Sequence, residues 1–172
     1  MRTAIELWFR DADPVSILAL SYAAHEIIHR LYRRKGLKDL LFDSRNIREE
    51  RRDEFNNLLK EWPNFIKHAQ RESSADDAIE DFNPRACILW LAMCITGLDR
   101  MGEARSDLEE AFMFWLYLNN PTWFPQDVTN ERIPVERLEA MREMDKQGFL
   151  EGFLQARREQ RARGLGANGK PI

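Results

Sequence analysis

Hydrophobic residues recur every three or four positions along most of this chain, a spacing typical of α-helices rather than β-strands. In the clearest stretch, Asp13 is the predicted N-cap, Pro14 the first helical residue and Gly36 the stop. Only the side that carries Glu26 and Arg30 is expected to face water, so this helix is predicted to lie at the centre of the fold. Its two apolar strips are Ile17, Leu20, Ala24, Ile27, Ile28 and Leu31, and beside them Leu18, Tyr22, His25, His29 and Tyr32.

The remaining segments show the same periodicity between helix start and stop signals. The expected elements are a short helix that a Thr3–Glu6 capping box opens, a charged helix from Ser44 to Trp62 that Pro63 ends, a turn or short helix at Asn64–Ala69, a core helix from Pro84 to Gly102, a helix from Ser106 to Leu118, and a charged helix from Pro134 towards Arg163.

These elements predict an all-α, single-domain helical bundle of about five core helices, with a projecting C-terminal helix. A chain of 172 residues is long enough for one domain with its own core. The bundle is expected to span residues 1–125, followed by a charged helical arm over 126–163 and a disordered tail over 164–172.

Composition indicates a soluble protein of the cytoplasm. The net charge is −3, from 26 basic and 29 acidic residues, so no overall field attracts RNA or an anionic membrane, and a role with RNA is only weakly supported. The apolar run from Ala86 to Leu98 is too short for a membrane span, and the N-terminus lacks a signal-peptide pattern. Cys87 and Cys94 are predicted to be reduced core residues.

His25, Glu26 and His29 form an HExxH motif, in which two histidines on one helix face hold zinc or another divalent metal. A metal-dependent hydrolase would need a third ligand, for which His68 is the best candidate, with Glu26 as general base. The basic residues that follow His29 disfavour a cation. The alternative is that both histidines are half-buried bundle residues, and we expect no bound cofactor.

The segment from Asn64 to His68 resembles the motif of the HEPN superfamily of helical domains. Their ribonuclease members carry an arginine, a polar residue, three variable residues and a histidine. Asn64 and His68 match the polar residue and the histidine at that spacing, whereas Pro63 stands at the arginine position. The resemblance implies an RNA-acting enzyme that uses Asn64 and His68; the proline would remove the charge that stabilises the transition state.

The chain also resembles an uncharacterised bacterial family of all-helical proteins of similar length. The resemblance rests on Asp13-Pro14-Val15-Ser16, Ala23-Ala24-His25-Glu26-Ile27-Ile28-His29, Asn64-Phe65-Ile66-Lys67-His68-Ala69 and Phe82-Asn83-Pro84. It implies a bacterial cytoplasmic domain. Together these observations predict a non-enzymatic interaction module that acts as a homodimer or through a protein partner. A metal-dependent hydrolase and a HEPN-like RNA-acting enzyme are the alternatives.

Overall fold

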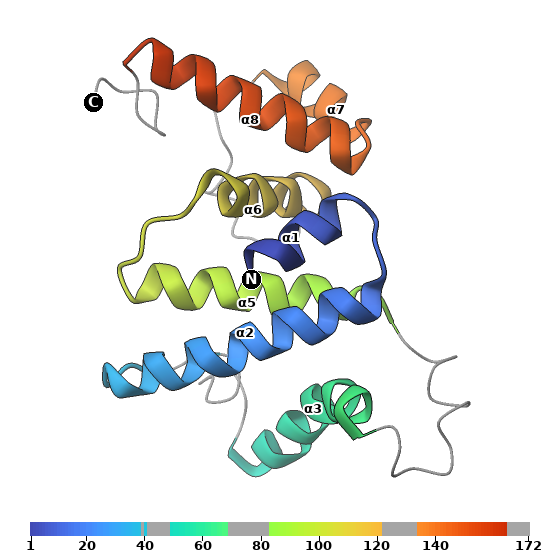
Figure 1. Ribbon diagram of the computed structural model, residues 1–172, viewed down its shortest axis with the longest axis vertical. Coiled ribbons are helices and arrows are strands. Elements are labelled where there is room, and N and C mark those ends of the chain that lie inside the picture. The colour runs from blue at the N-terminus through green and yellow to red at the C-terminus, as the bar shows by residue number, and fades with distance from the viewer. Residues whose placement is uncertain (39, 41–48, 69–82, 122–133, 165–172) are drawn as a thin grey trace. The chain divides into compact units, whose positions relative to one another are not determined.

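The computed structural model describes residues 1–38, 40, 49–68, 83–121 and 134–164. Several side chains between residues 52 and 68, that of His68 among them, lie outside this description. Throughout these ranges the regular structure is helical, which confirms the all-α bundle (Figure 1). The helices are α1 (Arg2–Phe9), α2 (Pro14–Arg34), α3 (Arg52–His68), α5 (Ala86–Arg100), α6 (Asp107–Asn119), α7 (Val135–Arg142) and α8 (Lys146–Ala162), with a 3₁₀ turn at Glu49–Arg51 before α3.

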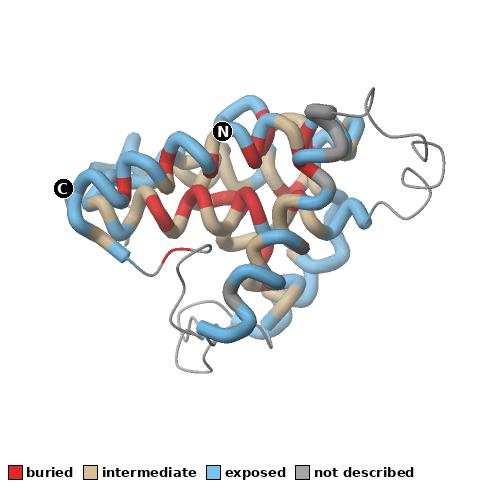
Figure 2. The backbone as a smooth tube through the Cα atoms, turned by 90° about the horizontal axis from the view of Figure 1, so that it is seen from below, coloured by how far each residue is buried: buried red, intermediate tan, exposed pale blue. Residues whose placement is uncertain are grey.

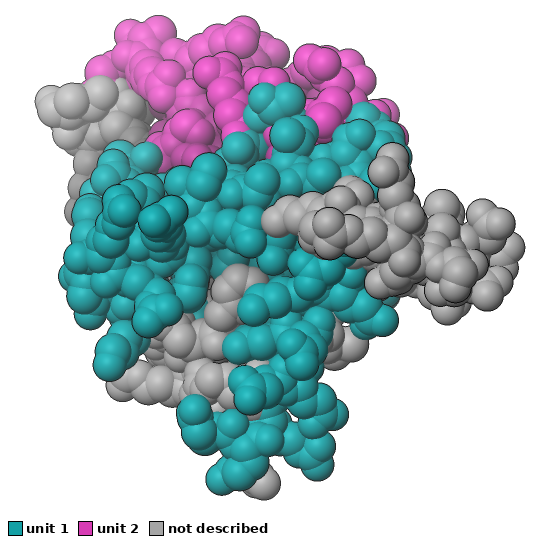
Figure 3. Space-filling model, turned by 60° about the horizontal axis from the view of Figure 1, so that its bottom comes forward, with its two compact units in different colours: residues 1, 3, 12–104 teal, residues 2, 4–11, 105–172 magenta. Residues whose placement is uncertain are grey.

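Contacts divide the chain into two compact units (Figure 3). The first contains residues 12–104 together with Met1 and Thr3, and the second contains residues 105–172 together with Arg2 and residues 4–11. The boundary between the two units falls near residue 104. Although α1 comes first in the chain, it belongs to the second unit, because its aromatic side chains pack with α6 and α8.

The core of the first unit forms where α2 packs along α5 (Figure 1). The side chain of Ile28 lies so close to Gly97 that a Cβ atom there would come within 2.7 Å of its Cγ2 atom and 3.2 Å from Leu40 Cδ2. Glycine thus lets the two helices approach closely. The buried hydrophobic residues of the pair are Ile17, Leu18, Tyr22, Ile28 and Tyr32 on α2, and Cys87, Trp90, Leu91, Cys94 and Ile95 on α5 (Figure 2).

Two of the predicted caps are present and one is not. The Asp13 carboxylate accepts a hydrogen bond from the backbone N–H of Ser16 at 2.9 Å, as an N-cap of α2 should. At the start of α6, Ser106 and Glu109 form a capping box. The capping box predicted at Thr3 is wrong, because α1 already begins at Arg2 and the Glu6 carboxylate instead accepts from the Arg2 side chain.

The prediction that Pro63 ends a helix is also wrong. Pro63 is buried inside α3, which continues to His68, so the missing N–H interrupts the helical hydrogen bonds without ending the helix. Asn64 consequently lies on the exposed surface of a helix and not at a turn or cap. The predicted start at Ser44 lies outside the described residues.

Aromatic rings from three helices form the core of the second unit. The ring of Trp8 lies 5.0 Å from Phe112 and 4.5 Å from Trp115, both in edge-to-face geometry. The ring of Phe9 stacks on buried Phe149 of α8 at 6.3 Å. The C-terminal segment therefore packs into the core of the second unit through Phe149 of α8.

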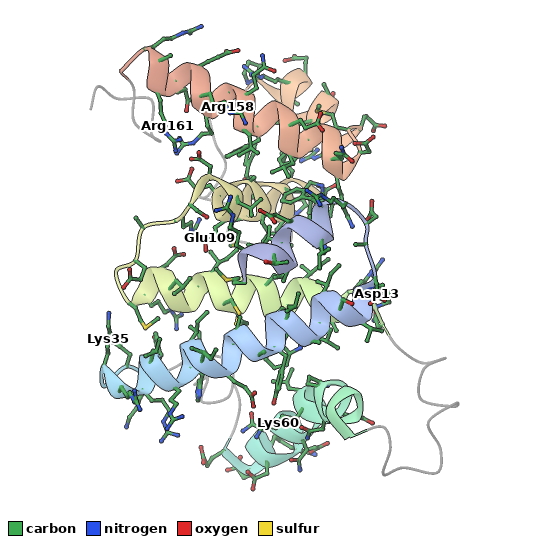
Figure 4. The ribbon with its side chains drawn as sticks, viewed as in Figure 1. Asp13, Lys35, Lys60, Glu109, Arg158 and Arg161 are labelled. Atoms are coloured by element: carbon green, nitrogen blue, oxygen red, sulfur yellow. The ribbon has the colours of Figure 1, made fainter. Side chains whose placement is uncertain are left out.

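The predicted C-terminal helix is two helices, because Asp145 interrupts it. Asp145 has an extended conformation, and its carboxylate accepts a hydrogen bond from the Gly148 N–H at 2.6 Å, which caps α8. Ion pairs hold α8 to α6: the half-buried Arg157 guanidinium lies 3.3 Å from Asp107 and 2.8 Å from Glu110. Arg161, which Figure 4 labels on α8, also pairs with Asp107.

Substitution of Gly97 by alanine tests the close approach of α2 and α5. The added methyl group would collide with the stiff, branched side chain of Ile28, so we expect Gly97→Ala to lower the free energy of unfolding by about 1–3 kcal/mol. Gly152→Ala is the matched control in α8, where the nearest atom, Met144 Cε, is 3.7 Å from the new Cβ. It should stabilise by about 0.5–1 kcal/mol. Urea denaturation measures both, and equal effects would contradict the close contact.

Candidate functional site

The residues of the HExxH motif lie on α2, where His25 belongs to the core of the first unit. The His25 side chain is fully buried, and its ring lies 4.9 Å from the ring of Trp90 on α5 in edge-to-face geometry. The His29 ring is half-buried and stacks on His25 at 5.9 Å. The two imidazoles therefore share one helix face, as the spacing predicts, and that face turns towards an aromatic neighbour.

Glu26, the predicted general base, is exposed and interacts with a neighbour on its own helix. Its carboxylate accepts a hydrogen bond from the Tyr22 hydroxyl one turn earlier. Burial, and then the charge and hydrogen bond of Glu26, raise the pKa of Tyr22 to about 12. Glu26 is therefore the hydrogen-bond partner of the buried Tyr22. The centroid of the Tyr22 ring lies 4.9 Å from that of Trp90.

The third predicted metal ligand and the RNA-acting pair are only partly placed. His68 is the last residue of α3, and its side chain lies outside the described part of the chain. Asn64, one turn earlier, is exposed. Among the described residues, no three histidine, cysteine, aspartate or glutamate side chains come together in a way that could hold a metal ion. The zinc site at His25, His29 and His68 and the pairing of Asn64 with His68 therefore stay predictions.

The structure corrects the predicted burial of α2 and thereby reveals an apolar surface. Leu20, Ile27 and Leu31 were expected in the core, but 41%, 63% and 44% of their respective surfaces are exposed. Ala23, between the first two, is exposed as well. We call Leu20, Ala23, Ile27 and Leu31 the open face of α2.

The rotation of α2 about its axis explains this exposure. The side that meets α5 bears Tyr22, His25 and Ile28, so the second predicted strip is the buried one. Because successive residues are about 100° apart, Ile27 points well away from both Tyr22 and Ile28. The first strip is split: Ile17 and Ile28 at its edge are buried and Ala24 is half-buried, whereas Leu20, Ile27 and Leu31 belong to the open face.

Arginine side chains lie beside the open face at the C-terminal end of α2. Arg30 and Arg34 are exposed one turn apart, whereas no charged residue occurs between Asp13 and Glu26. Lys35, just after the helix, donates a hydrogen bond to the Met101 carbonyl at 3.1 Å. The open face is therefore neutral at its N-terminal end and basic at its C-terminal end.

Sequence reasoning missed the open face, although one signal was present. Ile17, Leu20, Ala24, Ile27 and Leu31 alternate in steps of three and four, the spacing of a helix–helix seam. That spacing does not say whether the seam is filled by the same chain. Only the exposed fractions identify Leu20, Ile27 and Leu31 as candidates for binding.

The predicted state of the cysteines is confirmed. Cys87 and Cys94 are buried thiols that are not joined in a disulfide. The Cys94 thiol donates to the Ser21 carbonyl at 3.4 Å, and burial raises its pKa to about 12, an effect that the N-terminal charge offsets only in part.

Comparison of the chain with protein-family models, with curated proteins and with solved structures found no match. Within the described ranges, the helices are too short or too polar to cross a lipid bilayer.

The raised pKa of Cys94 predicts an alkaline loss of stability. An unfolded thiol titrates near pH 9 and the folded one near 12, so the stabilisation is complete below pH 9 and is lost as the pH rises towards 12. Between pH 8 and pH 10 the free energy of unfolding should fall by about 1 kcal/mol more in the wild type than in Cys94→Ala. Urea denaturation at the two pH values measures this, and identical losses in the two proteins would contradict the assignment.

Proposed function

We propose that this protein is a non-enzymatic helical interaction module of the bacterial cytoplasm, related to HEPN-type domains, and that it binds a protein partner through the open face of α2. The observation that carries the proposal is the exposure of Leu20, Ile27 and Leu31 on one side of a helix whose other side is buried against α5. An apolar stripe bordered by charged residues is the usual composition of a surface that a helical partner covers.

The energy available at this surface suits a binding role. Complete burial of a leucine or isoleucine side chain contributes about 1.5–3 kcal/mol, so covering the exposed remainder of Leu20, Ile27 and Leu31 contributes roughly 1 kcal/mol each. Since Ile27 is the most exposed of the three, it has the most to gain from a partner. We expect it to be the central contact.

The surroundings of the HExxH residues also favour binding over catalysis. His25 packs against Trp90 in the core, and Glu26 accepts the hydrogen bond of Tyr22. A hydrolase would need both groups directed at a metal-bound water. In the first unit these side chains instead support the orientation of α2.

Site-specific photocrosslinking tests the proposal. A benzophenone amino acid placed at position 27 should form a covalent adduct with a protein in living cells, because a bound partner would lie within reach of its ring. The matched control carries the same amino acid at position 135, since Val135 on α7 is exposed to the same degree, 64% against 63%. Mass spectrometry of the adduct identifies the captured protein.

The comparison between the two positions decides the outcome. An adduct that forms at position 27 and not at position 135 supports the proposed function. If neither position, or only position 135, is crosslinked under conditions in which both variants are folded, the open face is not a binding surface.

A further inference from the structure

We infer that the occupant of the open face is a second copy of this chain, paired antiparallel along α2. This inference rests on the proposed function and names the partner. It draws on three properties of α2: the spacing of its apolar residues, the sizes of the residues that would face each other, and the position of its charges.

The spacing of the open face is that of a helix that meets another helix with the same spacing. Leu20, Ile27 and Leu31 of the open face, together with the neighbouring Ala24, follow the four–three–four alternation of a heptad repeat, with Leu20 and Leu31 about 16 Å apart along the axis. Ile17, one step further towards the N-terminus, is buried in the core and stays outside this seam. Leu20, Ile27 and Leu31 are exposed and Ala24 is half-buried. A second α2 necessarily presents the identical spacing.

The sizes of the side chains complement each other when the two helices run antiparallel. The two-fold axis would pass at the level of residues 25 and 26, which is halfway between Leu20 and Leu31 along α2. Leu20 would then face the partner's Leu31. Ala24 would face the partner's Ile27, so that the most exposed large residue meets a small one. Because the symmetry repeats each contact, one helix face supplies both halves of the interface.

The charges select the antiparallel over the parallel arrangement. Arg30 and Arg34 occupy the C-terminal half of α2, whereas the N-terminal half is uncharged up to Asp13; Asp13 and Lys35 mark opposite ends of the helix (Figure 4). A parallel pair would place each arginine against its own copy. In the antiparallel pair the two Arg30 positions are about 13 Å apart along the axis, beyond the roughly 8 Å screening length at physiological salt.

The antiparallel pair also brings opposite ends of the two helices together. The basic end that carries Arg34 would approach the N-terminal end of the partner's α2, where the Asp13 carboxylate lies. The helix dipoles would oppose each other favourably as well. A seam of this length buries less surface than a standard interface, which buries roughly 800 Å² per partner. The dimer should therefore dissociate on dilution in the micromolar range.

Sedimentation velocity over about 1 to 100 µM tests the association. The wild-type chain should shift from monomer to dimer. Ile27→Glu places a carboxylate at both central positions and should raise the dissociation constant by at least about tenfold. Val135→Glu, a matched change at an equally exposed site, should sediment like the wild type. Circular dichroism confirms that each variant has kept its helices.

Disulfide trapping tests the orientation independently of the charged variant. Ala24→Cys and Ile27→Cys chains of different tag length, mixed and oxidised, should form mainly the mixed disulfide, because only the antiparallel pair places these two positions opposite each other. The native Cys87 and Cys94 are buried, so they should not compete. Same-site disulfides at 24 and 27 would indicate a parallel pair and overturn the inference.

The two proposals fail in different ways. A wild-type chain that stays monomeric at every concentration and gives no mixed disulfide overturns the second copy as partner. If the photocrosslinker at position 27 then captures a different protein, the proposed binding role stands and only its occupant changes. If it captures nothing, both proposals fail.

Discussion

The close approach of α5 to α2 at Gly97 sets the orientation of α2. Ile28 and Leu40 occupy the space that a side chain at position 97 would fill, and Trp90, two turns earlier on α5, packs on Tyr22 and His25. These contacts fix the rotation of α2 about its own axis. The side of α2 that bears Tyr22, His25 and Ile28 is buried against α5. Ile27 lies on another side of the helix and is therefore exposed.

The same rotation decides the environment of the HExxH residues. It buries His25 against an aromatic ring and leaves Glu26 on the outer surface, where the carboxylate accepts the hydrogen bond of the Tyr22 hydroxyl. A motif that a sequence pattern assigns to metal chemistry is thus built into the packing of two helices. In the second unit, the ion pair between Arg157 of α8 and Asp107 of α6 likewise holds one helix to another.

The second unit holds its helices together by a different combination of forces. Aromatic rings from α1, α6 and α8 supply its core, and the Lys146 ammonium lies 4.2 Å above the ring of Trp8 while it pairs with Asp11. Asp11 has a left-handed backbone conformation (φ 49°), so this ion pair accompanies the turn that ends α1. Contacts of this kind join segments more than 100 residues apart, which no local pattern in the sequence reveals.

The sequence by itself determined that the protein is all-α, where α2, α5 and α6 begin and end, and that its cysteines are buried thiols. Caps such as Asp13 and Ser106 and the helical spacing of apolar residues act within a few positions, so they can be read locally. The tertiary structure decided that Pro63 lies within a helix, that Asp145 divides the last one, and which apolar strip of α2 is buried. Both strips are hydrophobic enough for a core, and only the positions of Trp90 and Gly97 on α5 determine which one is covered. The exposed Leu20, Ile27 and Leu31 are therefore a property of the packed helices and not of the helix alone.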